Sequence, residues 1–289
     1  MVSVIIPTYN RAALVERAAK SVLSQSYSDL ELIIVDDGST DNTKMLLESL
    51  NDSRVRYIYQ QNSGACAARN NGIDHANGEY IAFHDSDDVW HVDKLEKQLA
   101  ILKSTDADLV FCCMNNHKTG RLIGNNFPEG ICATSILPYG VGTQTLCANS
   151  IVFKSERFDE NMPRLQDFEL LLRIAKKYKI YYLNEPLVDY YIQDDSISSN
   201  PEKLLRAWEL ILKKNPDLKS DYSGELCKAA LGLLSITSRV NAQDKNQVIK
   251  TALKLNTSAR VIIKSILVRF PFLYKKIVAV HKFLLKLKI

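Results

Sequence analysis

Short apolar runs alternate with amphipathic stretches along the first part of the chain. The apolar runs predict strands at 2–6, 30–35, 55–59, 80–83 and 109–113. Between these runs, apolar residues recur at helical spacing, which predicts helices around 15–22, 46–50, 65–76 and 93–103. This alternating order predicts an α/β fold in which helices flank a mostly parallel sheet.

The last third of the chain has a different pattern. Helices are expected near 204–212 and 226–234, and from Arg260 onward apolar and basic residues interleave. No apolar run there reaches the roughly 20 residues that a transmembrane helix needs, so this segment is not expected to span a membrane. Two interpretations stay open: a basic amphipathic anchor on an anionic membrane surface, or a helical extension that packs on the preceding domain with a solvated basic face.

Composition limits the kind of protein. The chain has 289 residues, of which 46% are hydrophobic, enough for one large domain or for a domain with an extension. The net charge of +4 hides an asymmetry, because eleven basic residues and no acidic residue follow Asp244. Residues 1–244 hold the other 26 basic residues against all 33 acidic ones, a net charge of −7. An acidic body of this kind weakens the case for nucleic-acid binding, and no nucleic-acid partner is expected.

The N-terminus and the cysteines indicate a cytoplasmic protein. The first apolar run reaches Pro7 without a basic segment before it, which makes it a poor secretory signal. The six cysteines form no C-x-x-C pair and no metal-ligand spacing, so buried reduced thiols are expected rather than disulfides.

Two acidic clusters follow predicted strands directly. Asp36-Asp37 comes after the second strand, and Asp85-Ser86-Asp87-Asp88 comes after the fourth. Ligands of open α/β sheets bind outside the carboxyl ends of the strands, so both clusters should face one crevice. An extended stretch would point Asp85 and Asp87 to the same side, where a divalent cation could relieve their repulsion and hold a diphosphate. Alternatively, these are ordinary turn and helix-capping residues that end a strand.

Five stretches occur together in a recognisable order. They are V-S-V-I-I-P-T-Y-N-R (2–11), I-I-V-D-D-G-S-T-D (33–41), A-R-N-N-G-I (68–73), G-E-Y-I-A-F-H-D-S-D-D (78–88) and Q-D-F-E-L-L-L-R (166–173). As a set they resemble the family 2 nucleotide-sugar glycosyltransferases with the GT-A fold, such as those that build bacterial surface polysaccharides. The resemblance covers about residues 1–200. It implies a Rossmann-like GT-A catalytic domain over 1–200 and does not extend to the rest of the chain. The residue pattern itself predicts a helical, basic amphipathic C-terminal extension over 201–289.

The resemblance also implies roles in binding the donor nucleotide. The residues concerned are Pro7, Thr8, Tyr9, Asp37, Arg69 and Asp85. In such enzymes the loop after the first strand cradles the nucleobase, with Tyr9 as a stacking surface, and Asp37 holds the base. Arg69 is expected near the base or the phosphates, and Asp85 at the ribose. Asp87 is the expected ligand of Mn²⁺ or Mg²⁺, which would bind the diphosphate.

Asp167 matches the catalytic aspartate of the family and would act as the base that takes the proton of the acceptor hydroxyl. It is expected at the start of a helix, where the macrodipole should keep its pKa low. An ordinary acidic residue at a helix N-terminus is the alternative, and Glu169 is expected to point elsewhere. One departure concerns Gln193, which stands where many members of the family have a histidine that can contact the metal or the phosphate.

The expected function is transfer of a sugar, with inversion, from a nucleoside-diphosphate sugar, best a UDP-sugar, to a hydroxyl of a saccharide or lipid-linked saccharide. The setting would be surface-polysaccharide assembly at the inner face of the cell membrane. Two alternatives are a non-catalytic, membrane-associated nucleotide-sugar-binding scaffold and a sugar-phosphate nucleotidyltransferase, although no glycine-rich, arginine-containing loop follows the first strand. The dehydrogenase and P-loop fingerprints do not occur.

Overall fold

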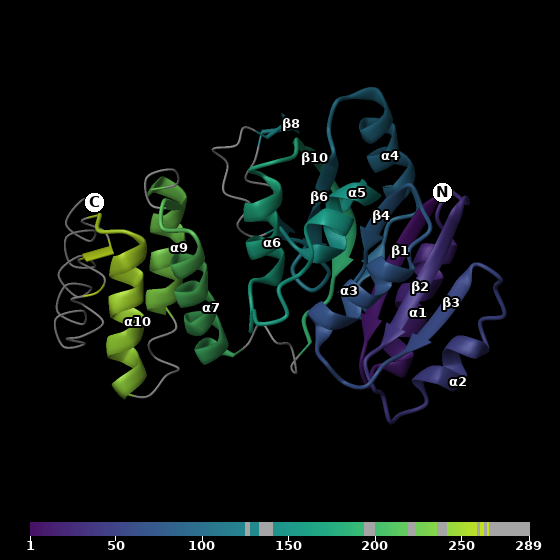
Figure 1. The fold of residues 1–289 in the computed structure, drawn as a ribbon, viewed down its shortest axis with the longest axis horizontal. Coiled ribbons are helices and arrows are strands. Elements are labelled where there is room, and N and C mark those ends of the chain that lie inside the picture. Colours follow the sequence, from purple (N-terminus) through teal and green to yellow (C-terminus); the bar gives the residue numbers. More distant parts are fainter. Residues whose placement is uncertain are drawn as a thin grey trace, which may run out of the picture. The chain divides into compact units, whose positions relative to one another are not determined.

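The computed structural model describes residues 1–124, 128–132, 141–193, 200–218, 223–235 and 242–258, together with 261, 262 and 265 (Figure 1). The chain divides into two compact units, Met1–Ser196 and Ile197–Ile289. The basic amphipathic stretch expected from Arg260 onward lies almost wholly outside the described residues.

A single mixed sheet forms the centre of the first unit. Its strands are β1 (Val2–Thr8), β2 (Leu30–Asp36), β3 (Val55–Tyr59), β4 (Tyr80–Phe83), β5 (Val89–Trp90), β6 (Leu109–Asn116), β7 (Leu122–Ile123), β8 (Gly130–Ile131), β9 (Cys147–Asn149) and β10 (Ile180–Tyr190). The order is β3-β2-β1-β4-β9-β6-β10-β5, with β7 beside β6 and β8 beside β10. The pairs among β1 to β4 are parallel, as is β6 with β10, whereas β9 is antiparallel to both of its neighbours.

Helices cover both faces of this sheet. They are α1 (Ala12–Leu23), α2 (Thr43–Glu48), α3 (Ala65–His75), α4 (Lys94–Ser104), α5 (Ser150–Ser155) and α6 (Gln166–Ile174), with a 3-10 turn at Thr143–Thr145. Buried residues of α1, α2 and α4 form one apolar cluster with the sheet, and those of α3, α5 and α6 form a second. Successive strand residues contribute to opposite clusters, as β1 shows with Val4 and Ile5. The predicted α/β fold with a mostly parallel sheet flanked by helices is confirmed.

A glycine sets how closely α3 approaches the sheet. A Cβ at Gly72 would lie 2.4 Å from Cγ2 of Ile5, in the middle of β1. Only glycine therefore allows this packing distance without displacing the Ile5 side chain or the helix. The close packing fixes the position of the preceding turn of α3, which includes Arg69 and Asn70.

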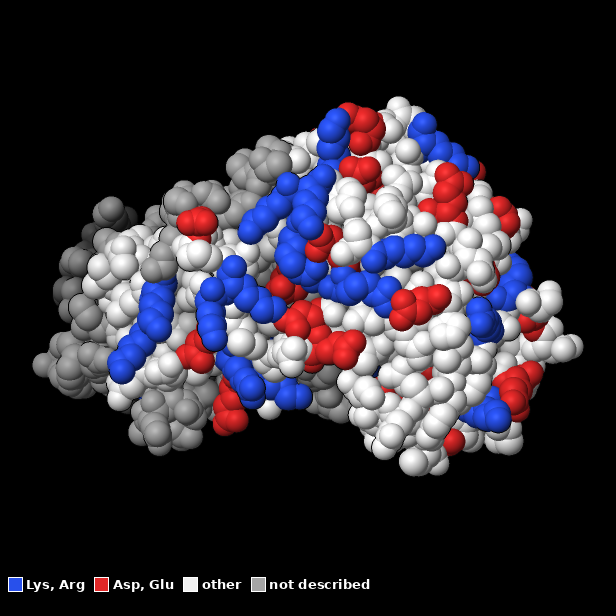
Figure 2. Space-filling model, viewed as in Figure 1, with Lys and Arg blue, Asp and Glu red and all other residues white. Residues whose placement is uncertain are grey.

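Acidic and basic side chains are interleaved on the surface of the first unit. Figure 2 shows them next to one another over much of the face that it draws. Ion pairs of this unit include Lys177 with Glu156, Arg157 with Asp74, and Lys179 with Asp106.

The second unit is helical where it is described. It contains α7 (Pro201–Lys214), α9 (Ser223–Ser235) and α10 (Ala242–Leu255), and α10 packs against the other two helices. Asn200 caps α7 by accepting hydrogen bonds from the backbone N–H groups of Glu202 and Lys203, with Pro201 in the first turn. Within the described part of the chain, no helix combines the length and apolar character required to cross a membrane.

Candidate active site

The three predicted donor-site segments meet at one edge of the sheet. β1 pairs in parallel with β2 on one side and with β4 on the other. The loops that follow these strands therefore leave the sheet at the same edge. The loop after β1 contains Tyr9, the loop after β2 contains Asp37, and the loop after β4 contains the acidic cluster from Asp85 to Asp88. The expected common location of the two acidic clusters agrees with this topology.

The loop after β1 combines buried and exposed groups. Pro7 and Thr8 are buried, whereas Tyr9 is 47% exposed, so its ring is accessible for stacking. The buried Thr8 hydroxyl has no hydrogen-bond partner among the described residues. Asn10, with a φ of 50°, donates its N–H to Ser39 Oγ and accepts from Thr40 N through Oδ1, both at 2.8 Å. These bonds fix the first loop to the loop after β2.

Asp37 is buried and already has several protein partners. Its carboxylate accepts hydrogen bonds of 2.8 Å from the backbone N–H groups of Ser63 and Gly64 and from Nε2 of Gln60. A carboxylate can accept about four hydrogen bonds, so there is room for about one more donor, such as a nucleobase N–H. The contacts also hold the loop between β3 and α3 against the end of β2.

The acidic cluster forms a turn rather than the expected extended stretch. The N–H of Asp88 lies 3.4 Å from the carbonyl of Asp85, and residues 86–87 are at the turn. Each of the two motif carboxylates pairs with an arginine: Asp85 Oδ1 lies 2.7 Å from Arg69 Nη2, and Asp87 Oδ2 lies 2.6 Å from Arg11 Nη1. The extended stretch on which a shared direction of Asp85 and Asp87 depended does not occur, and each carboxylate lies beside its own arginine.

Burial alters the acidity of this cluster. Burial and the nearby charge of Asp85 raise the pKa of Asp87 above its ordinary value, while Arg11 opposes this effect. Asp88 is completely buried, which raises its pKa to about 8. Its two oxygens accept from the backbone N–H of Tyr191 and from Nε2 of Gln144, both at 2.9 Å. Asp88 thus connects the acidic turn to the end of β10 and to the 3-10 turn, and its carboxylate is directed into the protein.

A row of polar residues along α1 also holds the acidic turn, and none of these residues belongs to a motif named above. Arg17 donates to the backbone carbonyl of Asp87, and Ser21 Oγ accepts from the N–H of Trp90 at 3.2 Å. Gln25, just beyond α1, donates to the carbonyl of His91 at 2.7 Å. The signal in the sequence is polar residues at intervals of four beside an apolar helix face.

Asp167 lies in the first turn of α6, where the charges of Arg69 and Asp85 act on it. It is the second residue of the helix, and the N-cap residue Leu165 has a left-handed φ of 58°. Burial raises the pKa of Asp167 to about 6, with the Arg69 charge lowering it and the Asp85 charge raising it further. The expectation of a low pKa from the helix dipole was therefore wrong, because desolvation outweighs both the dipole and the 2.7 Å bond from the N–H of Phe168.

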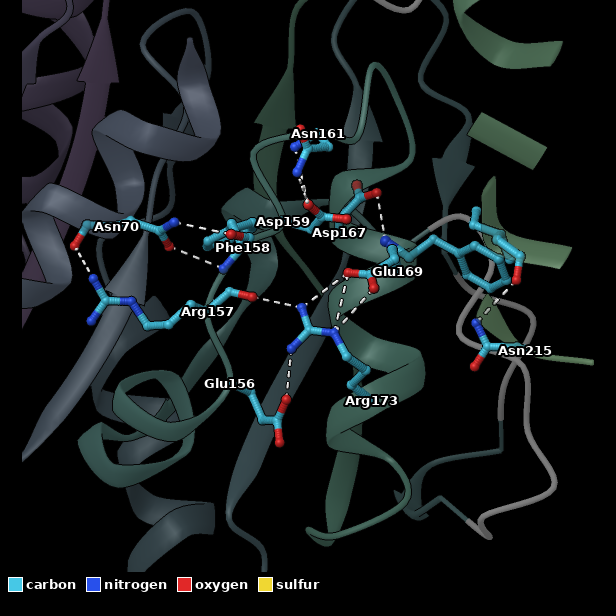
Figure 3. A network of polar contacts seen from close by, with 12 residues as sticks. Asn70, Glu156, Arg157, Phe158, Asp159, Asn161, Asp167, Glu169, Arg173 and Asn215 are labelled. Atoms are coloured by element: carbon cyan, nitrogen blue, oxygen red, sulfur yellow. Dashed lines mark hydrogen bonds and ion pairs between the residues drawn. The ribbon is translucent and has the colours of Figure 1, made fainter. Parts of the chain in front are cut away.

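Two sets of polar contacts hold the segment before α6 in place (Figure 3). Arg173 contacts Glu169 at 2.9 Å, Glu156 at 2.6 Å and the carbonyl of Arg157 at 2.6 Å. Glu169 therefore points away from Asp167, as predicted. Asn70 binds both backbone groups of Phe158, with Nδ2 2.9 Å from its carbonyl and Oδ1 3.0 Å from its N–H.

The donor set at the acidic turn is suited to a hard divalent cation. The two ion pairs with arginine use Oδ1 of Asp85 and Oδ2 of Asp87, so the second oxygen of each carboxylate is not engaged by them. Within the described ranges, no three His, Cys, Asp or Glu side chains form a complete cage for a metal ion. Mg²⁺ commonly binds through only one or two carboxylates, and substrate phosphates and water complete its coordination. The residues therefore fit a cation that binds together with a diphosphate.

This fold and this edge of the sheet define an α/β protein in which paired arginines and carboxylates gather where open α/β sheets bind their ligands. Residues 3–135 match the family described as glycosyl transferase family 2. TuaG of Bacillus subtilis, named as a teichuronic acid biosynthesis glycosyltransferase, is 36% identical over 213 residues, which are 70% of this chain and 83% of TuaG. The chain belongs to glycosyl transferase family 2 and is a glycosyltransferase.

Two further proteins are similar to this chain. WfgD of Escherichia coli, named as a UDP-Glc:α-D-GlcNAc-diphosphoundecaprenol β-1,3-glucosyltransferase, is 31% identical over 220 residues, 73% of this chain and 85% of WfgD. The crystal structure of S. aureus TarS 1–349 in complex with UDP-GlcNAc matches with a TM-score of 0.68 at 20% identity, covering 90% of this chain and 82% of that one. The likeness to TarS shows the fold and agrees with the predicted GT-A architecture.

Proposed function

We propose that this glycosyltransferase moves a sugar, with inversion, from a UDP-sugar to a hydroxyl of a saccharide acceptor. The observation that supports this best is Asp167, a partly buried carboxylate with a pKa near 6 that interacts electrostatically with Arg69 and Asp85. A general base works best with a pKa close to the working pH. The UDP-GlcNAc bound to the structurally similar TarS favours uridine as the nucleoside of the donor.

The donor would bind across the loops after β1, β2 and β4. Pro7, Thr8 and the exposed ring of Tyr9 would contact the nucleobase, with the remaining acceptor position of Asp37 directed to a base N–H. Asp85 would bind the ribose. Arg69, buried against the sheet and paired with Asp85, would lie beside the diphosphate.

Asp87 would hold Mn²⁺ or Mg²⁺ together with the diphosphate oxygens. When bound, such a cation neutralises negative charge on the leaving nucleoside diphosphate. The protein contributes a fixed position for the carboxylate. Arg17 binds the backbone carbonyl of Asp87, and the next residue, Asp88, is held by its hydrogen bonds with Gln144 and Tyr191.

The chemical step would be a single displacement. Asp167 accepts the proton of the acceptor hydroxyl as the hydroxyl oxygen attacks the anomeric carbon. The bond from this carbon to the diphosphate oxygen breaks, and the positive charge of Arg69 stabilises the departing diphosphate. Attack from the face opposite the leaving group inverts the configuration.

The acceptor would be a growing surface polysaccharide or a lipid-linked saccharide. The names of TuaG and WfgD support this class of acceptor. We propose residues 1–200 as the catalytic domain and 201–289 as an extension, whose basic C-terminal segment would bind an anionic membrane surface from the cytoplasmic side.

The first test is binding of UDP, GDP, CDP and dTDP by calorimetry, with Mn²⁺ or with EDTA, to the wild type and to Asp87→Ala. We expect UDP to bind in the presence of Mn²⁺, and binding to weaken at least tenfold in EDTA or in the variant. Binding of none of the four nucleotides would refute the proposed donor site. Nucleotide binding without sugar transfer or slow donor hydrolysis would instead indicate a non-catalytic scaffold.

A further inference from the structure

The carboxylate proposed for the metal is paired with a cationic side chain of the protein itself. Arg11 Nη1 lies 2.6 Å from Asp87 Oδ2, and the two side chains are 21% and 18% exposed. Arg11 lies at the N-cap of α1, directly after the loop that follows β1. This contact bears on the metal only if the proposed function is correct, so the inference rests on it.

A divalent cation and this guanidinium cannot share Asp87 without strong repulsion. Like charges at contact distance repel most strongly where the surroundings are partly desolvated. The neighbouring pair is different, because the Arg69 side chain is only 8% exposed, stacks over the Phe158 ring at 5.4 Å and contacts Asp85 rather than Asp87. Arg11 is thus the more accessible of the two arginines and the one that blocks the metal ligand.

The geometry lets Arg11 leave Asp87 while the acidic turn stays in place. Its backbone is fixed, since its carbonyl accepts from the N–H groups of Leu14 and Val15 in the first turn of α1. The turn is held independently, because Arg17 binds the backbone carbonyl of Asp87 and stacks on the Tyr191 ring at 4.0 Å. The exchange can therefore take place by rotation of the Arg11 side chain, with the backbone of α1 and the acidic turn unchanged.

We propose that Arg11 is an exchangeable counter-ion: it neutralises Asp87 in the free protein, releases it to the incoming cation, and then binds the diphosphate. Guanidinium groups form paired hydrogen bonds with phosphate oxygens as readily as with carboxylates. The exchange keeps the site close to electrical neutrality, since the cation and the diphosphate enter together. Metal and nucleotide binding should consequently be coupled, with weak metal binding in the absence of nucleotide.

Arg11→Met tests both parts of the exchange, competition with the cation for Asp87 and binding of the diphosphate. The methionine has no positive charge but keeps an apolar side chain of similar length. We expect Mn²⁺ alone to bind about three- to tenfold more tightly to this variant, the range that loss of one partly exposed ion pair allows. UDP in the presence of Mn²⁺ should bind about tenfold more weakly, because one charge-assisted contact to phosphate is lost. Electron paramagnetic resonance of free Mn²⁺ measures the first quantity, and calorimetry with UDP measures the second.

Two further variants complete the experiment. Lys20→Met removes one positive charge from the same helix, at an exposed pair with Glu16, and should leave both affinities unchanged. Arg11→Lys retains the positive charge but lacks the paired, coplanar N–H donors of the guanidinium. It should therefore bind Mn²⁺ like the wild type and UDP less tightly. Unchanged Mn²⁺ affinity in Arg11→Met, or undiminished UDP affinity in both Arg11 variants, would overturn the inference. A wild-type protein that binds neither Mn²⁺ nor UDP would overturn the proposed function instead.

Discussion

Replacing Asp167 with asparagine should abolish sugar transfer and, at neutral pH, stabilise the protein. Burial keeps the pKa of this carboxyl at about 6, compared with 3.8 for an ordinary aspartate. The unfolded chain therefore loses its proton at a lower pH than the folded protein does. As the pH rises from about 4 to 6, the free energy of unfolding of the wild type falls, and this loss persists above pH 6.

The size of the effect follows from this pKa difference. A difference of about two pH units corresponds to about 3 kcal/mol, and partial exposure of Asp167 to solvent reduces the expected value to about 1 to 2 kcal/mol. The asparagine side chain is nearly isosteric and does not ionise. Asp167→Asn should thus exceed the wild type in stability by about 1 to 2 kcal/mol at pH 7 and match it near pH 3.

Activity should vary in the opposite direction over the same pH range. Only ionised Asp167 can accept a proton, so the rate should be about half-maximal at pH 6 and about one tenth of maximal at pH 5. The assays are urea unfolding of both proteins between pH 3 and 8, and release of UDP from the UDP-sugar that binds, with water as acceptor. A variant with wild-type turnover, or a rate that halves only near pH 4, would refute the assignment of Asp167 as the base.

Three other substitutions test how the site is built. Gly72→Ala places a Cβ within 2.4 Å of Ile5 and should destabilise the first unit by about 2 kcal/mol in urea unfolding; unchanged stability would contradict the packing argument. Arg173→Met leaves two buried glutamates without their main counter-ion and should cost about 3 kcal/mol, whereas the matched change Lys177→Met, at a more exposed side chain, should cost less than about 1 kcal/mol. Asn70→Ala should lower kcat about tenfold while UDP affinity stays within about twofold, and an equal loss of both would mean that the residue supports the whole domain.

The parallel core of the fold was predictable from the sequence because its strands are short, mainly apolar segments separated by amphipathic ones. The runs at 30–35 and 80–83 occur as β2 and β4, and the alternating helices fix their parallel order. The short strands β5 and β9 have only two or three residues, too few for any periodicity to be visible. Their places are set by pairing with β10, β4 and β6, which is information from distant parts of the chain.

The candidate site was predictable in its residue types but not in its electrostatics. The motifs identified Asp85, Asp87 and Asp167 as residues of interest, while their partners and pKa values depend on contacts across the fold. Arg11 and Asp87 are 76 positions apart, and no local pattern links them. The expected lowering of the Asp167 pKa came from the helix dipole alone. Burial raises this pKa instead, and the degree of burial is a property of the packed domain.

One turn of α3 connects Asp85 to the segment that precedes Asp167. Consecutive helical residues point about 100° apart, so Arg69 and Asn70 can reach different segments from one backbone position. Arg69 binds Asp85 and stacks on Phe158, while Asn70 binds both backbone groups of the same Phe158 in the segment that leads to Asp167. Because Gly72 packs this turn tightly on β1, the sheet constrains the positions of both Asp85 and the segment that leads to Asp167. In the proposed reaction, Asp167 would then be positioned relative to the donor before any acceptor binds, and positioning of this kind is a large part of what a displacement reaction requires.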